Sequence, residues 1–135
     1  MPKNIIADSS ALVAFISRDD QHHGWIAAHA ANLPAPWLTC EPALTETFHL
    51  VGDKGESQLK DLLRRDAIVL SFDLEEELKS VLALMDKYVD VPMSLADACL
   101  VRMTELLAEP FLITTDGDFK IYRRHSRQVV PCLMP

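Results

Sequence analysis

Apolar residues along this chain form two kinds of segment, short continuous runs and longer stretches in which apolar and polar positions alternate at helical spacing. A short run of apolar or β-branched residues is typical of a strand that is buried on both faces of a parallel sheet. We therefore predict strands at Asn4–Ala7, around Trp37, and at residues 67–72, 111–114 and 128–133.

Helices are predicted in the segments between these runs, at residues 11–16, 22–32, 43–51, 58–65, 73–88 and 94–108. Ser9 or Ser10 can cap the first of them, and Pro42 suits the first turn of the third, which should end near Gly52. Further along, Asp73 and Glu76 have the spacing of a capping box at the start of residues 73–88.

The helix at residues 94–108 has its own start signal, because Ser94 and Asp97 also have the spacing of a capping box. One apolar stripe is predicted to bury this helix, and it consists of Leu95, Cys99, Met103 and Leu106.

The alternation of strands and helices predicts the fold class. Continuous apolar strands separated by helices favour an α/β fold, here a three-layer α/β/α sandwich with a central, mainly parallel sheet of four to five strands. The 135 residues show no composition shift that would mark a linker, and 49% of them are hydrophobic. We expect one domain over residues 1–135.

Charge and cysteine content narrow the function classes. The net charge of −7 argues against a module that binds nucleic acid non-specifically, but it is compatible with an enzyme whose acids hold a cation. Cys40, Cys99 and Cys132 are widely spaced and predict reduced thiols. The longest apolar run, residues 11–16, is too short to cross a membrane, so we expect a soluble, cytoplasmic protein.

Several acids fall where predicted strands end or helices begin. Asp8 follows the first strand, Asp116 and Asp118 follow residues 111–114, and Asp97 lies in the first turn of its helix. Each has a purely structural explanation. Asp8 and Asp97 can cap helices, while Asp116 and Asp118 can form an Asx-type turn in which Gly117 takes a positive φ.

Taken together, these acids point to a metal site. The carboxyl ends of parallel strands meet at one edge of a sheet, so Asp8, Asp97 and Asp116 should converge there. Carboxylates a few ångströms apart repel one another unless a cation neutralises them. Mg²⁺ or Mn²⁺ prefers such oxygen ligands and keeps positions free for water and phosphate.

Four blocks of the sequence resemble the acid-bearing blocks of the PIN-domain family, in the family's order. They read "IIADSSALVAFI", "EPALTETFHL", "PMSLADACLVRMTE" and "LITTDGDFKIY", and the resemblance extends from about Ile5 to Leu133. The length also resembles that of the VapC-type toxin ribonucleases of toxin–antitoxin pairs. The resemblance implies a PIN-like fold and cleavage of RNA phosphodiester bonds that depends on Mg²⁺ or Mn²⁺.

Residue by residue, the resemblance places the catalytic acids at Asp8, Glu46, Asp97 and Asp116, with Asp118 as a further acid. Glu41 is a second choice for the role of Glu46. We expect Asp8, Asp97 and Asp116 to bind the metal, and Glu46 with Asp118 to orient water or a second ion. Hydroxyl groups near the metal in the family correspond to Ser10 and Thr114.

The resemblance also implies partners. Toxins of this kind form dimers and are masked by a small antitoxin, so a homodimer and a cognate antitoxin are expected. Lys120, Arg123 and Arg124 follow the acidic turn, and they either contact the RNA backbone or place positive charge at a helix C-terminus.

Three other functions are compatible with the same residues. A PIN nuclease of RNA processing would use the same chemistry without being a toxin. A non-catalytic α/β binding module would use the acids as caps and turns only. A phosphatase with Asp8 as nucleophile is a third, but "DSSAL" lacks the second acid two residues on that this chemistry uses as its acid and base.

Overall fold

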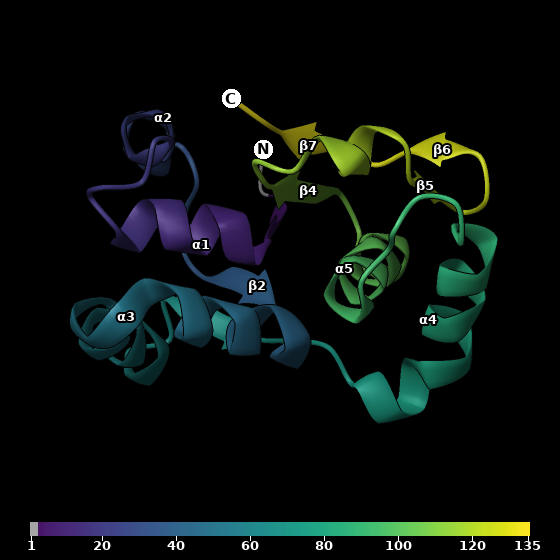
Figure 1. Cartoon of the computed structure of the whole chain (residues 1–135), viewed down its shortest axis with the longest axis horizontal. Helices are drawn as coiled ribbons and strands as arrows, with labels where there is room; N and C mark the ends of the chain where they lie inside the picture. Colours follow the sequence, from purple (N-terminus) through teal and green to yellow (C-terminus); the bar gives the residue numbers. More distant parts are fainter. Residues whose placement is uncertain (1–2) are drawn as a thin grey trace.

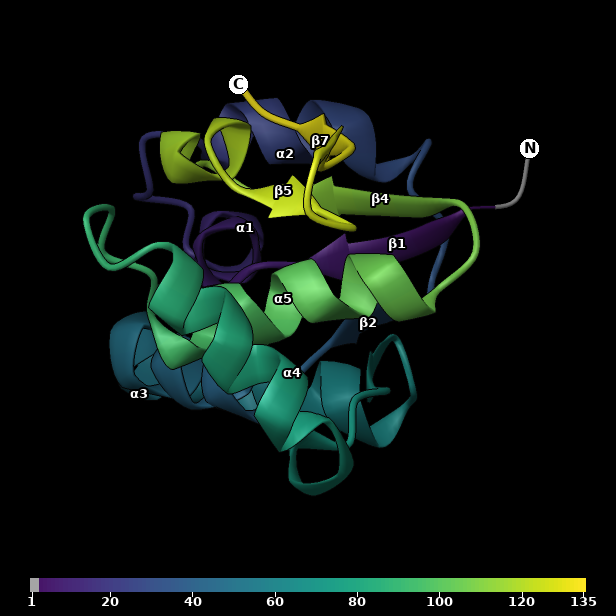
Figure 2. The ribbon, with the colours of Figure 1, turned by 90° about the vertical axis from the view of Figure 1, so that its right-hand side faces the viewer.

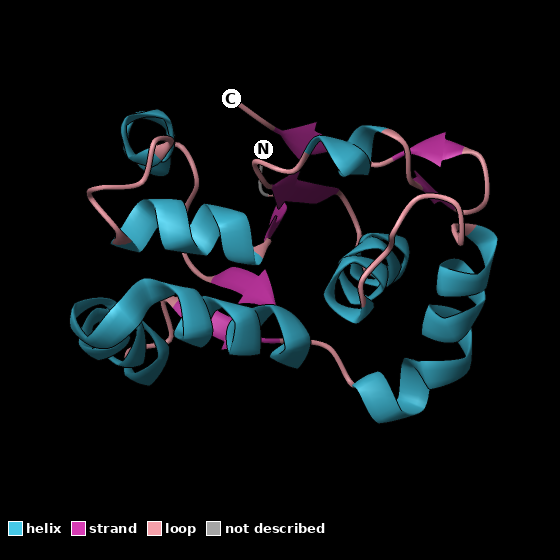
Figure 3. Cartoon of the chain, in the orientation of Figure 1, coloured by secondary structure: helices cyan, strands magenta, loops and turns pink. Residues whose placement is uncertain are grey.

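A parallel five-stranded sheet forms the centre of the computed structural model, which describes residues 3–135 (Figure 3). The strand order is β3-β2-β1-β4-β7. The strands are β1 (Asn4–Ala7), β2 (Trp37–Thr39), β3 (Ile68–Leu70), β4 (Pro110–Ile113) and β7 (Cys132–Leu133). Every pairing in this sheet is parallel, so the carboxyl ends of all five strands lie at one edge.

Helices cover both faces of the sheet (Figures 1 and 2). One layer holds α1 (Ser9–Ile16), α2 (His23–Ala30) and α3 (Glu41–Arg64). The other holds α4 (Leu74–Lys87) and α5 (Leu95–Leu106). The predicted α/β/α sandwich with a parallel sheet is confirmed.

The central strand β1 explains why its sequence is continuously apolar. Ile5 and Ala7 belong to the core under α1, α2 and α3, whereas Ile6 belongs to the core under α5. Successive side chains of a strand point to opposite faces, so a strand covered on both sides needs apolar residues at every position. Asp8 then ends the strand at the polar edge of the sheet.

The predicted last strand at residues 128–133 is wrong as one element. Pro131 divides it, because proline has no N–H for a continuous ladder. Residues before the proline form β6 (Gln128–Val129), which pairs antiparallel with β5 (Arg123–Arg124). The residues after it form β7, which joins the main sheet beside β4.

Helix boundaries follow the predictions with local differences. The predicted helices at residues 43–51 and 58–65 are parts of α3, which is broken at Gly52, where φ is 69°. The predicted stripe of α5 is only half right. Cys99 and Met103 are buried, but Leu95 and Leu106 are 38% and 50% exposed because they lie at the ends of the helix.

Two expectations from composition concern thiols and membranes. The cysteines are free thiols, with Cys40 and Cys99 buried and Cys132 partly buried. Within residues 3–135, no helix combines the length and the apolar character that a bilayer crossing needs.

Candidate active site

Asp8 lies at the junction of β1 and α1 and is 4% exposed. It is the N-cap of α1, since its Oδ1 accepts a hydrogen bond of 2.7 Å from the N–H of Ser9. The predicted cap at Ser9 or Ser10 is therefore wrong by one or two residues. The strand brings Asp8 to the sheet edge beside β4, where its own N–H donates to the carbonyl of Ile113.

The second oxygen of Asp8 is held by two hydroxyl groups. Thr114 Oγ1 donates to Oδ2 over 2.7 Å, and Ser10 Oγ donates to the same oxygen over 3.1 Å. These hydroxyls also accept backbone N–H groups from Thr115 and Asp116, at 3.0 Å each. Ser10 and Thr114 thus tie the start of α1 to the end of β4 around one buried carboxylate.

Asp97 lies in the first turn of α5 and closes the predicted capping box with Ser94. The N–H of Asp97 donates to Ser94 Oγ over 3.0 Å, and the N–H of Ser94 donates back to Asp97 Oδ2 over 3.4 Å. A third group, the hydroxyl of Tyr122, lies 3.2 Å from the same Oδ2. Both donors act on one oxygen, so among residues 3–135 Oδ1 keeps no hydrogen-bond donor.

Asp116 and Asp118 follow β4, and their local structure differs from the predicted turn. Asp116 Oδ1 accepts the N–H of Asp118 over 2.9 Å, as an Asx-type turn requires. Gly117 does not take a positive φ, however, because it begins the 3₁₀ helix η1 (Gly117–Lys120), for which Asp116 is the N-cap. That part of the turn prediction is wrong.

Glu46 reaches the same edge from α3 through a residue that the sequence interpretation missed. Ser9 Oγ donates to Glu46 Oε1 over 3.0 Å and also lies 3.4 Å from Asp8 Oδ1. Glu41, the second choice, is exposed in the first turn of the same helix and lines a surface hollow with residues 70–75. No signal singled out Ser9, because "DSS" offers two hydroxyls and only the fold decides which one faces Glu46.

Burial and neighbouring charge act on the carboxyl groups of Asp8 and Asp97. Burial raises the pKa of Asp8, against the hydroxyl hydrogen bonds that lower it, and the charge of Asp116 adds to the rise. Burial and then the charge of Asp8 raise the pKa of Asp97 to about 6, and Asp116 contributes as well. The charges of Asp8 and Asp116 thus both act on Asp97, and the convergence of the three acids around one cation stays a prediction.

The side chains do not form a closed metal shell in their present orientations. Within residues 3–135, no three histidine, cysteine, aspartate or glutamate side chains are grouped closely enough to hold an ion. The donor set itself suits Mg²⁺ or Mn²⁺, since it consists of carboxylate oxygens with hydroxyls around them. Asp97 Oδ1 and Asp116 Oδ2 are available as ligands without breaking a hydrogen bond.

Tyr122 is the second residue that the sequence did not reveal. Its ring is fully buried, and burial together with the charge of Asp97 raises the pKa of the phenol, so the hydroxyl remains a donor. Tyr122 is the last residue of the block "LITTDGDFKIY", but no role was predicted for it, because its contact with Asp97 depends on how η1 packs against α5.

The basic residues after the acidic turn are largely engaged with the protein. One guanidinium nitrogen of Arg123 donates to the carbonyls of Lys120, Ile121 and Tyr122. Arg124 donates to the carbonyl of Thr104 and to Gln128. The side chain of Lys120, by contrast, is exposed.

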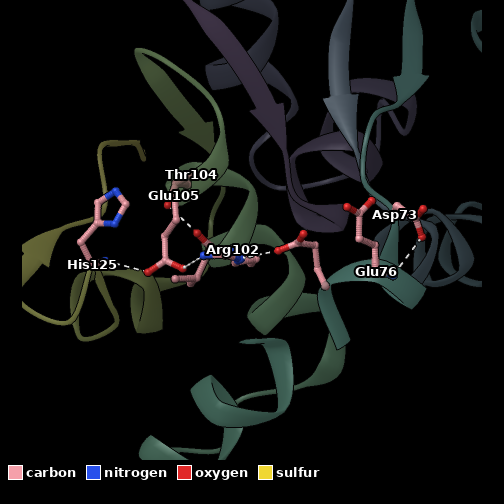
Figure 4. A network of polar contacts seen from close by, with 8 residues as sticks. Asp73, Glu76, Arg102, Thr104, Glu105 and His125 are labelled. Carbon is pink, nitrogen blue, oxygen red and sulfur yellow. Dashed lines mark hydrogen bonds and ion pairs between the residues drawn. The ribbon is translucent and has the colours of Figure 1, made fainter. Parts of the chain in front are cut away.

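An ionic network anchors the loop that follows Arg124 (Figure 4). The backbone N–H of His125 donates to Glu105 Oε2 over 2.7 Å. The other oxygen of Glu105 pairs with Arg102, which also pairs with Glu77 over 2.7 Å. The β5–β6 hairpin is therefore pinned to α5 and α4.

Comparisons with known proteins agree with this geometry. The model of the PIN domain family matches residues 5–124. The fold is similar to the crystal structure of VapC20 from Mycobacterium tuberculosis, described as a toxin that cleaves the sarcin–ricin loop. That match has a TM-score of 0.78 and 18% sequence identity, and it covers 92% of this chain and 98% of VapC20. A comparison with curated proteins gave no match. Because the family model covers most of its length, the chain belongs to the PIN-domain family, a family of nucleases.

Proposed function

We propose that this protein is an endoribonuclease that depends on Mg²⁺ or Mn²⁺, and that it is the toxin of a type II toxin–antitoxin pair. The observation that carries the proposal is the buried Asp8 at the carboxyl edge of the sheet, 4% exposed, whose charge helps to raise the pKa of the half-buried Asp97 to about 6. Such a group is costly without a function that uses its charge.

Each acid has a proposed role. Asp8, Asp97 and Asp116 would hold the cation, while Ser10 and Thr114 keep Asp8 oriented. When bound, a divalent cation polarises a phosphoryl oxygen and lowers the pKa of a bound water. Glu46, supported by Ser9, and Asp118 would then orient the attacking water or a second ion on the open side of the site.

RNA as substrate is supported by the fold it shares with VapC20, a toxin that cleaves the sarcin–ricin loop. A small cognate antitoxin, a homodimer and a place in the cytoplasm belong to the same proposal. Lys120, Arg123 and Arg124 remain candidates for contact with the RNA backbone. One nuclease domain over residues 1–135 would carry the whole activity.

The decisive experiment is cleavage of a panel of structured RNAs by the purified protein with Mn²⁺, with chelator, and with Asp97→Asn. We expect cleavage only with the metal and only with Asp97 intact. Asp86→Asn is the matched control, because Asp86 is an exposed acid on α4 and should leave the rate unchanged. Cleavage that survives both the chelator and Asp97→Asn would contradict the mechanism.

The toxin role is a separate step from the chemistry. A nuclease of RNA processing would cleave RNA with the same metal requirement but would have no antitoxin. Production of the protein in bacteria should arrest growth, and co-production of the product of a short reading frame adjoining its gene should relieve the arrest. Growth that is insensitive to the active protein would leave the RNA-processing function in its place.

A non-catalytic binding module is the second candidate function. It has a specific observation in its favour, because Asp8 and Asp116 are each the N-cap of a helix and Asp97 completes the capping box of α5. This candidate predicts that Mn²⁺ does not raise the melting temperature. The nuclease predicts that it does, because a ligand that binds only the folded state stabilises it.

A further inference from the structure

Tyr122 is held rigidly beneath the proposed site. Its side chain is fully buried, and its ring makes edge contacts with Phe119 and Tyr88 at centroid distances of 5.3 and 5.2 Å. Aromatic rings packed at these distances stabilise one another and fix each other's orientation. The hydroxyl at the end of this ring is consequently placed by the core.

The hydroxyl joins two segments that carry proposed ligands. It lies 3.2 Å from Asp97 Oδ2, at the start of α5, and 3.1 Å from the carbonyl oxygen of Pro92, in the turn before α5. Tyr122 itself follows η1, whose N-cap is Asp116. A donor to a carboxylate is stronger than one to a neutral carbonyl, so Asp97 is the preferred acceptor.

We propose that Tyr122 is a positioning residue for the metal site, an inference that rests on the proposed function. By donating to Oδ2, the phenol fixes the rotation of the Asp97 carboxylate and leaves Oδ1 as the oxygen that can bind the cation. The same contact sets the spacing between the start of α5 and the end of β4, and hence between two of the three proposed ligands.

The distinction from an ordinary core tyrosine lies in what the hydroxyl does. Groups that hydrogen-bond to a metal ligand change metal affinity about 10- to 100-fold when they are removed. They need not change the rate at saturating metal, because the ligand can still bind in the right orientation once the ion is present. A hydroxyl with a purely structural role would instead lower stability and leave metal affinity intact.

The test compares Tyr122→Phe with Tyr88→Phe. The two variants lose the same atom from neighbouring rings, but the hydroxyl of Tyr88 accepts the backbone N–H of Arg123 over 2.8 Å and does not contact Asp97. Mn²⁺ affinity is measured by calorimetry without RNA. The Mn²⁺ concentration for half-maximal cleavage, the rate at saturating Mn²⁺ and the melting temperature without metal are measured alongside.

We expect Tyr122→Phe to weaken Mn²⁺ binding about 10- to 100-fold. Excess Mn²⁺ should restore cleavage to within about twofold of wild type. Tyr88→Phe should bind Mn²⁺ as wild type does. Equal Mn²⁺ affinity in Tyr122→Phe and wild type would overturn this inference alone, and so would a Tyr122→Phe variant that no longer folds. Absence of Mn²⁺ binding in wild type would overturn the metal-dependent function together with it.

Discussion

The two ends of the same parallel sheet have opposite chemistry. At the carboxyl end, β1 and β4 lead into Asp8 and Thr114, and hydrogen bonds hold both oxygens of the buried Asp8 carboxylate. At the amino end, β2 and β3 begin beside an apolar cavity of about 290 Å³, lined among others by Phe15, Leu33 and Trp37. The strands are shared, but one end buries charge and the other buries hydrocarbon.

The apolar end of the sheet offsets the energetic cost of the acidic end. Burying a carboxylate destabilises the folded state, whereas burying aromatic and aliphatic side chains stabilises it. A polar edge with clustered acids is stable only because the opposite edge and the two cores are apolar. Substitutions at the two ends should therefore separate stability from activity.

The largest effect is expected from Trp37→Ala at the apolar end. Trp37 is 6% exposed, packs edge-on against Phe15 at 5.1 Å, and donates its indole N–H to the carbonyl of Leu33 over 2.8 Å. Its removal should cost about 3–5 kcal/mol of unfolding free energy, measured by urea titration.

The control is Trp25→Ala, since Trp25 is only partly buried on α2 and should cost less. The cleavage rate per folded molecule should stay the same in both variants, because neither residue touches the acidic edge. A Trp37→Ala protein that is as stable as wild type would show that the apolar end does not support the fold in this way.

A smaller loss of stability is expected from Thr114→Val at the acidic end. The change removes the 2.7 Å hydrogen bond to Asp8 Oδ2 and the acceptor for the N–H of Asp116 while keeping the size of the side chain. A buried carboxylate that loses a hydrogen-bond donor should lower the free energy of unfolding by about 1–3 kcal/mol, measured by urea titration. Unlike Trp37→Ala, this variant should also lose cleavage per folded molecule.

Thr104→Val is its matched control. Thr104 is equally buried, but its hydroxyl donates only to the carbonyl of Val101 in the same helix. The cost should be smaller and cleavage should be unchanged. If the two threonine variants behaved alike, the hydroxyl of Thr114 would have no special role at Asp8.

The sequence predicted the layers and the direction of the sheet because those follow from local patterns. Continuous apolar runs such as residues 5–7 indicate burial on both faces of the sheet, and Asp8 marks the end of the strand. Capping signals such as Ser94 and Asp97 are equally local, and the capping box is present.

What could not be predicted depends on contacts between distant segments. Tyr122 reaches Asp97 across 25 residues and Ser9 reaches Glu46 across 37, and neither spacing follows a local rule. The division of residues 128–133 was partly predictable, because Pro131 is a local signal for a break. The pairing of Gln128–Val129 with β5 was not, because it depends on a second segment. Arg123 and Arg124, for which RNA contact and charge at a helix end were both open, donate to backbone carbonyls.

The stability of the acidic end should depend on pH in a definite direction. The pKa of Asp97 is raised to about 6 in the folded chain, against about 3.9 when unfolded. Between these values the folded state binds more protons, so stability should fall as pH rises from about 4 to about 6 and then level off. Asp8 acts in the same direction, because its pKa is raised as well.

Asp97→Asn removes this titration and should flatten the profile measured by urea midpoints in chelator. The variant should be more stable than wild type near neutral pH, while wild type recovers the difference below about pH 4. If the stability of the two proteins depended on pH in the same way, the pKa of Asp97 would not be raised in the folded state.

The smallest effect is expected in the basic segment, where Lys120 and Arg124 differ in what they contact. Lys120 is exposed on η1, whereas Arg124 donates to the carbonyl of Thr104 and to Gln128. If the exposed ammonium group of Lys120 contacts RNA, Lys120→Gln should weaken RNA binding a few-fold in the presence of chelator. It should also reduce the slope of log affinity against log salt concentration by about one phosphate contact. Arg124→Gln should instead lower stability and leave the salt slope unchanged, since the guanidinium of Arg124 already binds groups of the protein.

Fluorescence anisotropy of labelled RNA over a series of salt concentrations distinguishes the two variants. A reduced salt slope in Arg124→Gln alone would assign the RNA contact to Arg124.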